Sequence, residues 1–414
     1  MVTLGATLAA CGGSSGSSSL TWYINPDSGG QATIAKTCTE AAKGRYSIET
    51  SILPSDATAQ REQLIRRLAG EDSSVDLISL DPPFVPEFSQ ANFLYPIPQD
   101  KAAQFTDGIV ESAVRSATWN DKLVAVPFWA NTQLLWYRKS VADEAGLDMT
   151  KPVTWEQLVE AAKSQGKTVA VQANRYEGYT VWINALIQSA GGQVITNPEA
   201  APEDLELGLD STAGKEAAAV IKEVSTVGGP AMSTLDEEGA RALFQGEQGG
   251  FMVNWPYVIT AWRGEVEGGT LEQSVLDDIG WTIYPEVKEG EASQPPFGGI
   301  LIGIGAFTDQ PDFALEAVEC ITSEANQIEY MVTNGNPAAL KSAYQDKEVR
   351  KVYPTADLIV ESLDRAAPRP LTPYYSEVSS SLQREFHPPA SVTESTPGDA
   401  ATLIKGVING EVLL

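Results

Sequence analysis

The residues best suited to ligand chemistry in this chain gather in one stretch, Thr234 to Tyr257. Its pattern predicts a short helix to about Phe244, a stop at Gly246 and then an apolar strand that runs into Asn-Trp-Pro-Tyr. Trp255 and Tyr257, on either side of a proline, would present flat apolar rings with polar atoms on a stiff turn. Such a surface suits a sugar, because C–H faces stack on indole while hydroxyls seek hydrogen bonds. The alternative is that both rings belong to the hydrophobic core.

Two carboxylates could act on a glycosidic bond. Asp81 follows the apolar run VDLISL, and Glu238 lies in the first turn of the predicted helix. Such a pair can serve as acid and base in glycoside hydrolysis. The same residues could instead be a turn residue and a first-turn helix charge, or they could accept hydrogen bonds from vicinal sugar hydroxyls. The sequence leaves these three roles open.

The sequence lacks the residues that nucleophilic, metal-dependent or nucleotide-dependent catalysis would need. The single histidine, His387, lies in a polar, proline-flanked segment and is expected at the surface. The sequence contains no H-E-x-x-H or paired C-x-x-C spacing, no P-loop and no dinucleotide-binding glycine loop. The string GGSSG at 12–16 matches G-x-S-x-G only formally, because no strand precedes it. We therefore predict no metal and no cofactor.

The elements that must position these residues alternate between strand and helix at the start of the chain. Strand-like runs at 20–24, 46–53 and 75–80 are separated by helical stretches. This β-α-β-α-β order predicts an α/β fold with a parallel, doubly wound sheet. Ligands of such sheets lie beyond the carboxyl ends of the strands, where Asn25 and Asp81 both fall.

Later segments continue the same alternation. A strand is predicted to begin at 123–127, followed by a turn at 128–131. Thr154 and Gln157 have the spacing of a capping box that opens a helix. The apolar run at 300–305 is predicted to return to the first sheet, and two helices follow from about residue 311 to residue 331.

Length and charge narrow the class of protein. A chain of 414 residues exceeds one ordinary core, so two or three lobes are expected. The 28 basic and 55 acidic residues give a formal net charge of −27, which argues against nucleic acid or an anionic membrane surface as a partner. Acidity itself mainly promotes solubility and identifies no ligand.

The first residues resemble a processing signal. The string Leu-Ala-Ala-Cys that ends at Cys11 is similar to the lipobox of bacterial lipoproteins, in which the cysteine becomes lipid-modified. A Gly/Ser linker follows to Ser19, so the resemblance predicts a protein tethered outside the membrane. A chance alanine-rich terminus is the alternative. No other segment of the sequence is apolar enough to span a bilayer.

Two further cysteines are Cys38 and Cys320. In an exported protein they could form one disulfide between distant helices, or they could remain as buried thiols. The sequence does not give their separation in space, so both alternatives stay open.

Five strings, in the same order, resemble the trehalose/maltose-binding proteins of ABC importers. They are LVAVPFWANTQLLWYRK at 123–139, RYEG at 175–178, FQGEQGGFMVNWPY at 244–257, PPFGGILIGI at 295–304 and PRPLTPYYSEVS at 368–379. The resemblance implies a type II periplasmic-binding-protein-like fold, in which two α/β lobes joined by hinge strands close over a sugar. The implied division is a linker at 1–19, a first lobe of 20–126 plus 298–340, and a second lobe of 127–297 plus 341–414.

Matched position by position, the resemblance implies a set of sugar-binding residues. Trp255 would be the stacking indole, and Arg369, fixed between two prolines, would offer a planar donor fork. Gly298 and Gly299 would let backbone N–H groups approach the sugar. The full set is Asn25, Gln31, Asp81, Trp129, Asn131, Glu238, Trp255, Tyr257, Gly298, Gly299 and Arg369.

The choice between two adjacent glutamates rests on helix capping. Thr234 and Glu237 have the spacing of a capping box, which would occupy the Glu237 carboxylate at the helix start. Glu238 is therefore the preferred ligand of the pair.

The resemblance implies a lipid-tethered, substrate-binding component of an ABC importer that binds trehalose and catalyses no reaction. The protein would be exported, anchored to the outer face of the cytoplasmic membrane through Cys11, monomeric, and a partner of permease subunits. Many maltose binders carry more aromatic residues in the cleft, so the polar set here favours a compact non-reducing disaccharide.

Three alternatives remain. The chain could bind another solute, such as maltose or a maltodextrin, a glycerophosphodiester or a peptide. It could be a glycoside hydrolase that uses Asp81 and Glu238. A surface adhesion module is disfavoured, because the sequence shows neither repeats nor exposed apolar stretches.

Overall fold

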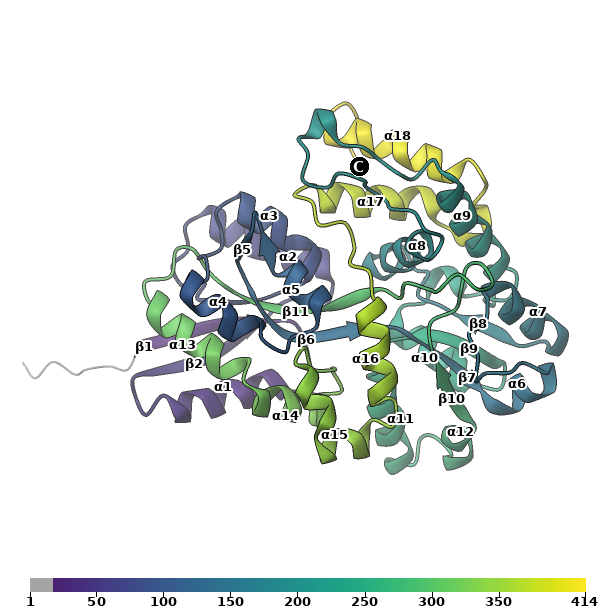
Figure 1. Ribbon diagram of the computed structural model, residues 1–414, viewed down its shortest axis with the longest axis horizontal. Helices are drawn as coiled ribbons and strands as arrows, with labels where there is room; N and C mark the ends of the chain where they lie inside the picture. Colours follow the sequence, from purple (N-terminus) through teal and green to yellow (C-terminus); the bar gives the residue numbers. More distant parts are fainter. Residues whose placement is uncertain (1–17) are drawn as a thin grey trace, which may run out of the picture.

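The computed structural model describes residues 18–414, which form two α/β units side by side (Figure 1). Cys11 and its lipobox-like string lie outside the described residues. Strand β1 begins at Ser18, so Ser18 and Ser19, which were expected in the linker, belong to the first sheet. Within residues 18–414, no helix combines the length and apolar character needed to cross a bilayer.

The first unit is built on a five-stranded sheet in the order β2-β1-β3-β11-β6. The strands are β1 (Ser18–Ile24), β2 (Tyr46–Ile52), β3 (Leu77–Leu80), β6 (Val126–Thr132) and β11 (Phe297–Ile304). Strand β1 pairs in parallel with β2 and β3, as predicted, whereas β11 runs antiparallel to β3 and β6. Because β1 and β3 end at the same edge, Asn25 and Asp81 follow them at that edge.

Helices pack around this sheet. They are α1 (Gly30–Ala41), α2 (Ala57–Ala69), η1 (Pro82–Phe84), α3 (Val85–Gln90), α4 (Gln99–Thr106), α5 (Glu111–Ser116), α13 (Pro311–Ile321) and α14 (Glu324–Asn334), with a small hairpin of β4 (Thr118–Trp119) and β5 (Lys122–Leu123). The prediction of two helices after residue 311 is confirmed. Helix α2 begins where Asp56 accepts a hydrogen bond from the Ala59 backbone, and it buries Leu64 and Leu68.

The second unit has a four-stranded sheet in the order β10-β7-β9-β8. Its strands are β7 (Leu134–Arg138), β8 (Thr168–Ala170), β9 (Gly249–Asn254) and β10 (Ile279–Thr282). Its larger helices are α6 (Lys139–Ala145), α7 (Trp155–Gln165), α8 (Glu177–Ser189), α9 (Thr212–Val224), α10 (Glu237–Gln245), α11 (Val258–Glu267), α12 (Gln273–Asp277), α17 (Tyr375–Phe386) and α18 (Thr396–Ile408). The predicted capping box of Thr154 and Gln157 is confirmed at the start of α7.

The chain passes between the sheets where β6 runs almost directly into β7. The predicted turn at 128–131 is wrong, because pairing with β11 continues along β6 to Thr132. Helix α16 (Ala356–Arg365) lies beside this crossing, and α15 (Lys347–Val352) precedes it next to α14 (Figure 1). A separate apolar cluster there contains Ala130 of β6, Leu134 of β7 and Ile359 of α16. The connection between the units is therefore itself packed.

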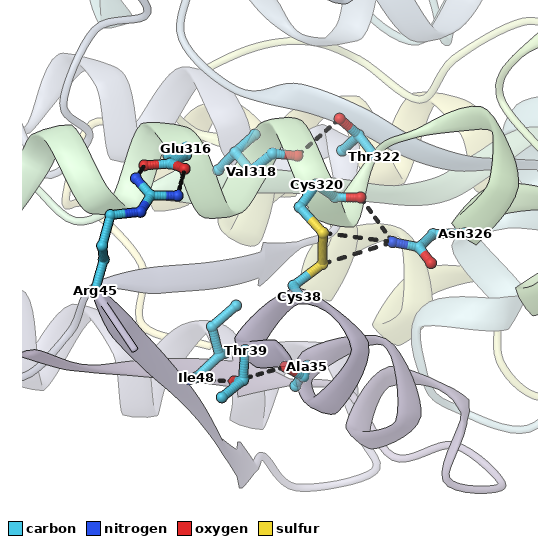
Figure 2. Close-up of a disulfide and its surroundings, with 10 residues drawn as sticks. All are labelled: Ala35, Cys38, Thr39, Arg45, Ile48, Glu316, Val318, Cys320, Thr322 and Asn326. Atoms are coloured by element: carbon cyan, nitrogen blue, oxygen red, sulfur yellow. Dashed lines mark hydrogen bonds and ion pairs between the residues drawn. A yellow bond between two sulfur atoms is a disulfide. The ribbon is translucent and has the colours of Figure 1, made fainter. Parts of the chain in front are cut away.

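A disulfide joins two distant parts of the first unit (Figure 2). Cys38 of α1 and Cys320 of α13 are 282 residues apart in sequence, and their Cα atoms are 5.8 Å apart. Of the two alternatives that the sequence left open, the structure contains the bond. The Asn326 Nδ2 atom donates to the Cys320 carbonyl at 2.7 Å and lies against both sulfurs.

His387, expected at the surface, is half-buried. Its Nε2 atom lies 3.0 Å from the Ser233 carbonyl oxygen, and its ring meets Tyr179 edge-on at 6.2 Å. The neighbouring Phe386 is fully buried, which draws the histidine inward.

Candidate functional site

A cavity of about 430 Å³ lies between the two units. The first unit contributes the segments that follow β1 and β3, together with parts of β6 and β11. The second contributes the start of α8, the start of α10 and the end of β9. Every residue of the predicted binding set except Gln31 lines it, namely Asn25, Asp81, Trp129, Asn131, Glu238, Trp255, Tyr257, Gly298, Gly299 and Arg369.

The first-unit wall carries polar atoms that have no partner in the protein. Asn25 Oδ1 and Trp129 Nε1 are both buried and make no hydrogen bond. Asn131 Oδ1 accepts from the Thr132 backbone at 3.0 Å, which orients the side chain from the edge of β6. Buried unpaired atoms also occur outside the cavity, for example Trp182 Nε1 and Tyr284 Oη, so it is the position of Asn25 and Trp129 on the cavity wall that suits this wall to a ligand with hydrogen-bonding groups.

Gln31 does not reach the cavity, so its predicted contact with a ligand is wrong. Its side chain is fully buried and points from α1 toward the sheet. Nε2 donates to the Asn25 carbonyl at 2.9 Å, and Oε1 accepts from Ser79 Oγ at 2.9 Å. Gln31 therefore supports the loop that carries Asn25.

Trp255 lies on the second-unit wall, directly after β9. Asn254 fixes this position, since its Oδ1 accepts from the Trp255 backbone at 2.8 Å and its Nδ2 donates to the Glu237 carbonyl at 3.0 Å. The indole crosses to the opposite unit, where a Cβ at Gly298 would lie 3.1 Å from the ring. The half-buried indole thus spans the cavity between a strand end and a glycine.

The two predicted glycines have packing roles that the sequence did not indicate. Gly298 makes room for the Trp255 ring. Gly299 adopts a φ of +130°, and a Cβ there would lie 2.3 Å from the Trp129 carbonyl oxygen. The predicted approach of their backbone N–H groups to a sugar remains a prediction, and these packing roles add to it.

The capping argument that favoured Glu238 over Glu237 is wrong. Asp236, not Thr234, caps α10 by accepting from the Gly239 backbone, so no capping box involves Glu237. Glu238 also lines the cavity, but it is 58% exposed and pairs with Arg241 at 2.6 Å. Burial alone would raise the pKa of Glu238, but hydrogen bonds from Arg241 and Tyr257 lower it below the ordinary value.

Glu237 is the more deeply placed carboxylate, and sequence reasoning missed it. Burial raises its pKa, and a hydrogen bond from its own backbone N–H offsets part of that rise. No ion pair holds Glu237 within residues 18–414. An aspartate immediately before the helix was the signal that could have reassigned the cap.

Tyr176 and its neighbours were also missed as site residues. The Tyr176 hydroxyl is buried, lines the cavity and makes no hydrogen bond. A Cβ at Gly178 would lie 2.2 Å from that hydroxyl oxygen, so the glycine makes room for the tyrosine. The RYEG string at 175–178 was the signal that could have identified Tyr176, because the family resemblance included it although no role was predicted for its residues.

Arg369 is bound by carboxylates of both units. Its Nη2 and Nη1 atoms donate to the two Asp81 oxygens at 2.6 and 3.1 Å, and Nη1 also donates to Glu177 Oε1 at 2.6 Å. Burial alone would lower the pKa of Arg369, but Asp81, Tyr375 and Glu177 raise it well above the ordinary value. The fork that was expected to donate to sugar hydroxyls donates here to Asp81 and Glu177, and Nε is the buried guanidinium atom that makes no hydrogen bond.

The site as a whole combines aromatic surface with unsatisfied hydrogen-bonding groups. Unpaired buried atoms belong to four lining residues, Asn25, Trp129, Tyr176 and Arg369. Across the part of the chain that the structure describes, no cluster of three or more metal-ligating side chains occurs. The arrangement can hold a small polar ligand with apolar faces through stacking and hydrogen bonds.

Comparison with known proteins gives the family. Residues 28–328 match the family described as bacterial extracellular solute-binding protein. A relative from Deinococcus radiodurans, named probable ABC transporter-binding protein, is 25% identical over 380 residues, which cover 88% of this chain and 87% of the relative.

Solved structures show the same fold. The chain is similar to maltose-bound MalE3 of T. maritima, with a TM-score of 0.79 and 24% identity over 96% of this chain and 100% of that one. It is also similar to the cyclic α-maltosyl-1,6-maltose binding protein of Arthrobacter globiformis, with a TM-score of 0.73 and 20% identity over 95% of this chain and 100% of that one. The predicted two-lobed fold, like that of maltose-binding proteins, is thereby confirmed. Because the family match covers more than half of its length, this chain belongs to the bacterial extracellular solute-binding protein family.

Proposed function

We propose that this chain is the substrate-binding component of an ABC sugar importer and that its interlobe cavity binds trehalose or a closely related disaccharide. The observation that carries the proposal is the set of unpaired polar atoms beside Trp129 and Trp255. A sugar satisfies both features together, because its hydroxyls donate and accept while its C–H faces stack on indole. The named ligands of similar structures, maltose and cyclic α-maltosyl-1,6-maltose, support the sugar class.

Trehalose is the specific ligand that we propose. The five strings resemble those of trehalose/maltose-binding proteins, and together with the lipobox-like string and the acidic composition they make the chain similar to the mycobacterial trehalose-recycling lipoprotein. The cavity of about 430 Å³ is compact and lined by several carboxylate, amide and hydroxyl groups. A site with many polar contacts discriminates among sugars, since each buried donor or acceptor left unmet costs roughly 1–3 kcal/mol.

The cellular setting follows from the same proposal. The protein is exported, held at the outer face of the cytoplasmic membrane by a lipid on Cys11, and delivers its sugar as a monomer to permease subunits. The sequence predicts lobes of 20–126 plus 298–340 and of 127–297 plus 341–414; because β6 extends to Thr132 and β11 begins at Phe297 within the first sheet, we assign both strands to the first lobe. The lobes move about the strands that connect them, so that the sugar bridges both walls in the closed state.

A glycoside hydrolase is the less favoured alternative. Both Asp81 oxygens accept hydrogen bonds from Arg369, so that carboxylate is committed as an acceptor. Glu238, the proposed partner, has a lowered pKa and pairs with Arg241, which does not suit a general acid.

Isothermal titration calorimetry with trehalose, maltose, maltotriose and glycerophosphocholine tests the proposal. Trehalose is expected to bind most tightly, and the protein is expected to release no glucose from it during prolonged incubation. Tighter binding of maltotriose or of the phosphodiester would overturn the trehalose assignment, and steady glucose release would overturn the transport role.

A further inference from the structure

One guanidinium, that of Arg369, is shared between carboxylates from different units. Asp81 follows β3 of the first sheet, and its two oxygens accept from Nη2 and Nη1. Glu177 opens α8 in the second unit and accepts from Nη1 at 2.6 Å. Arg369 is only 5% exposed and Glu177 only 7%, so the three charges are largely withdrawn from water.

Arg369 and Glu177 are held together on the second unit by contacts that do not involve Asp81. Asn184 of α8 donates to the Pro368 carbonyl at 3.3 Å, immediately before Arg369. Ser379 of α17 donates to Glu177 Oε2 at 2.6 Å, and helices α17 and α8 pack against each other. Ala367, two residues before Arg369, also pairs with Pro295 and Phe297 at the start of β11, so Arg369 lies beside a connection between the units. We expect the contacts with α8 and α17 to keep Arg369 beside Glu177 when the lobes part.

Tyr375 also contacts Glu177, the second-unit carboxylate that binds Arg369. Its hydroxyl donates to Glu177 Oε1, while its ring packs edge-on against Phe84 of η1 at 5.6 Å. The first turn of α17 thus touches the first unit, and the rest of the helix packs in the second (Figure 1). The only ion pair between the units among residues 18–414 that borders the cavity is the one between Arg369 and Asp81.

We propose that Asp81 and Glu177 act in opposite directions on lobe closure: Asp81 draws Arg369 across the cleft, and Glu177 keeps Arg369 neutralised when the lobes part. A buried cation that lost its only partner would resist opening strongly. Because Glu177 stays beside Arg369, opening breaks one ion pair and leaves another intact. Glu177 is therefore a positioning residue that acts through Arg369. It lowers the free-energy cost of opening the lobes and so favours release of the sugar.

Small-angle X-ray scattering of the sugar-free protein tests this directly, and it does so whatever solute the cleft binds. Asp81→Asn is expected to shift the equilibrium toward the open form on the order of tenfold or more, seen as a larger radius of gyration. Glu177→Gln keeps the hydrogen-bond acceptor but removes the competing charge, so the variant is expected to have a smaller radius of gyration than the unaltered protein, and an unchanged radius would overturn the role given to Glu177. Glu177→Asp, which shortens the side chain away from Arg369, is the second variant and is expected to behave like Glu177→Gln.

The matched control is Asp278→Asn. Asp278 pairs with Arg138 at 2.8 Å within the second unit, so the same charge change there should leave the radius of gyration unchanged. Circular dichroism melts verify that each variant is folded. Expansion by the Glu177 variants to the extent seen with Asp81→Asn would overturn the proposal, and so would an Asp81→Asn protein as compact as the unaltered one.

Discussion

Two cavities of similar size in this molecule are both rich in tryptophan, yet they differ in chemistry. The interlobe cavity has a volume of about 430 Å³ and contains Trp129 and Trp255. A second cavity of about 460 Å³ lies within the second unit between α11, α12 and β10, and it is lined by Trp136, Trp262 and Trp281. Size and aromatic content therefore do not tell them apart.

The difference lies in the hydrogen-bonding groups. In the second cavity the two buried indoles already have acceptors, since Trp136 Nε1 donates to the Asn254 carbonyl at 3.0 Å and Trp262 Nε1 to Gln245 at 3.1 Å. Lys139 and Gln273 are likewise engaged, both by Asp277. In the interlobe cavity, buried polar atoms of four lining residues have no partner. An aromatic wall marks a ligand site only where polar groups beside it are left for the ligand.

The difference between the two cavities is tested most strongly by removing one tryptophan from each. Trp255→Ala removes the stacking ring of the interlobe cavity, and sugar affinity is expected to fall about a hundredfold, equivalent to roughly 3 kcal/mol. Trp281→Ala removes the half-buried ring of the second cavity and is expected to leave the affinity unchanged. Calorimetric titration measures the sugar affinity of both variants. Equal losses of affinity would show that the two cavities were wrongly distinguished.

A smaller effect is expected from Glu237→Gln. The substitution keeps one acceptor but removes the charge that strengthens hydrogen bonds from hydroxyls, so affinity should fall about tenfold. Because burial raises the pKa of Glu237, affinity of the unaltered protein should decline as the pH is lowered, starting above the ordinary range of a glutamate. The variant should lose this pH dependence. Titrations at several pH values check both points, and an unchanged profile would contradict a ligand role.

Stability should move in the other direction in the same variant. A carboxyl group whose pKa is higher in the folded than in the unfolded protein loses stability as the pH rises through that window. Above the ordinary pKa of a glutamate the buried Glu237 therefore contributes less stability than it does at low pH, and Glu237→Gln is expected to increase the free energy of unfolding at pH 7. Urea denaturation at pH 7 measures it. A less stable variant would mean that Glu237 serves the fold more than the ligand.

The smallest effect on affinity is expected from removing the disulfide. The double substitution Cys38→Ser and Cys320→Ser opens a link across 282 residues, so the free energy of unfolding is expected to fall by roughly 4 kcal/mol. Neither cysteine lines the interlobe cavity, so sugar affinity at a temperature where the variant is folded should be unchanged. Denaturation and calorimetric titration of the same sample measure stability and affinity separately. Weakened sugar binding would show that the disulfide also affects the geometry of the interlobe cavity.

Patterns that depend on neighbouring residues were predictable from the sequence. The alternation of apolar runs and helices predicted the parallel start of the first sheet, and the spacing of Thr154 and Gln157 predicted a capping box that is present. The strings around Trp255 and Arg369 led to residues that the structure brings to one cavity, although they lie 114 positions apart (369 − 255). Local signals succeed because helix and strand preferences act within a few residues.

Only the tertiary structure decided how the site residues divide their hydrogen bonds. Arg369 was expected to bind a sugar with its fork, but the fork holds Asp81, a residue far away in sequence. Gln31 was expected in the cavity and instead supports the loop of Asn25. A side chain's partners depend on which distant groups the fold brings within about 3 Å, and no local pattern carries that information.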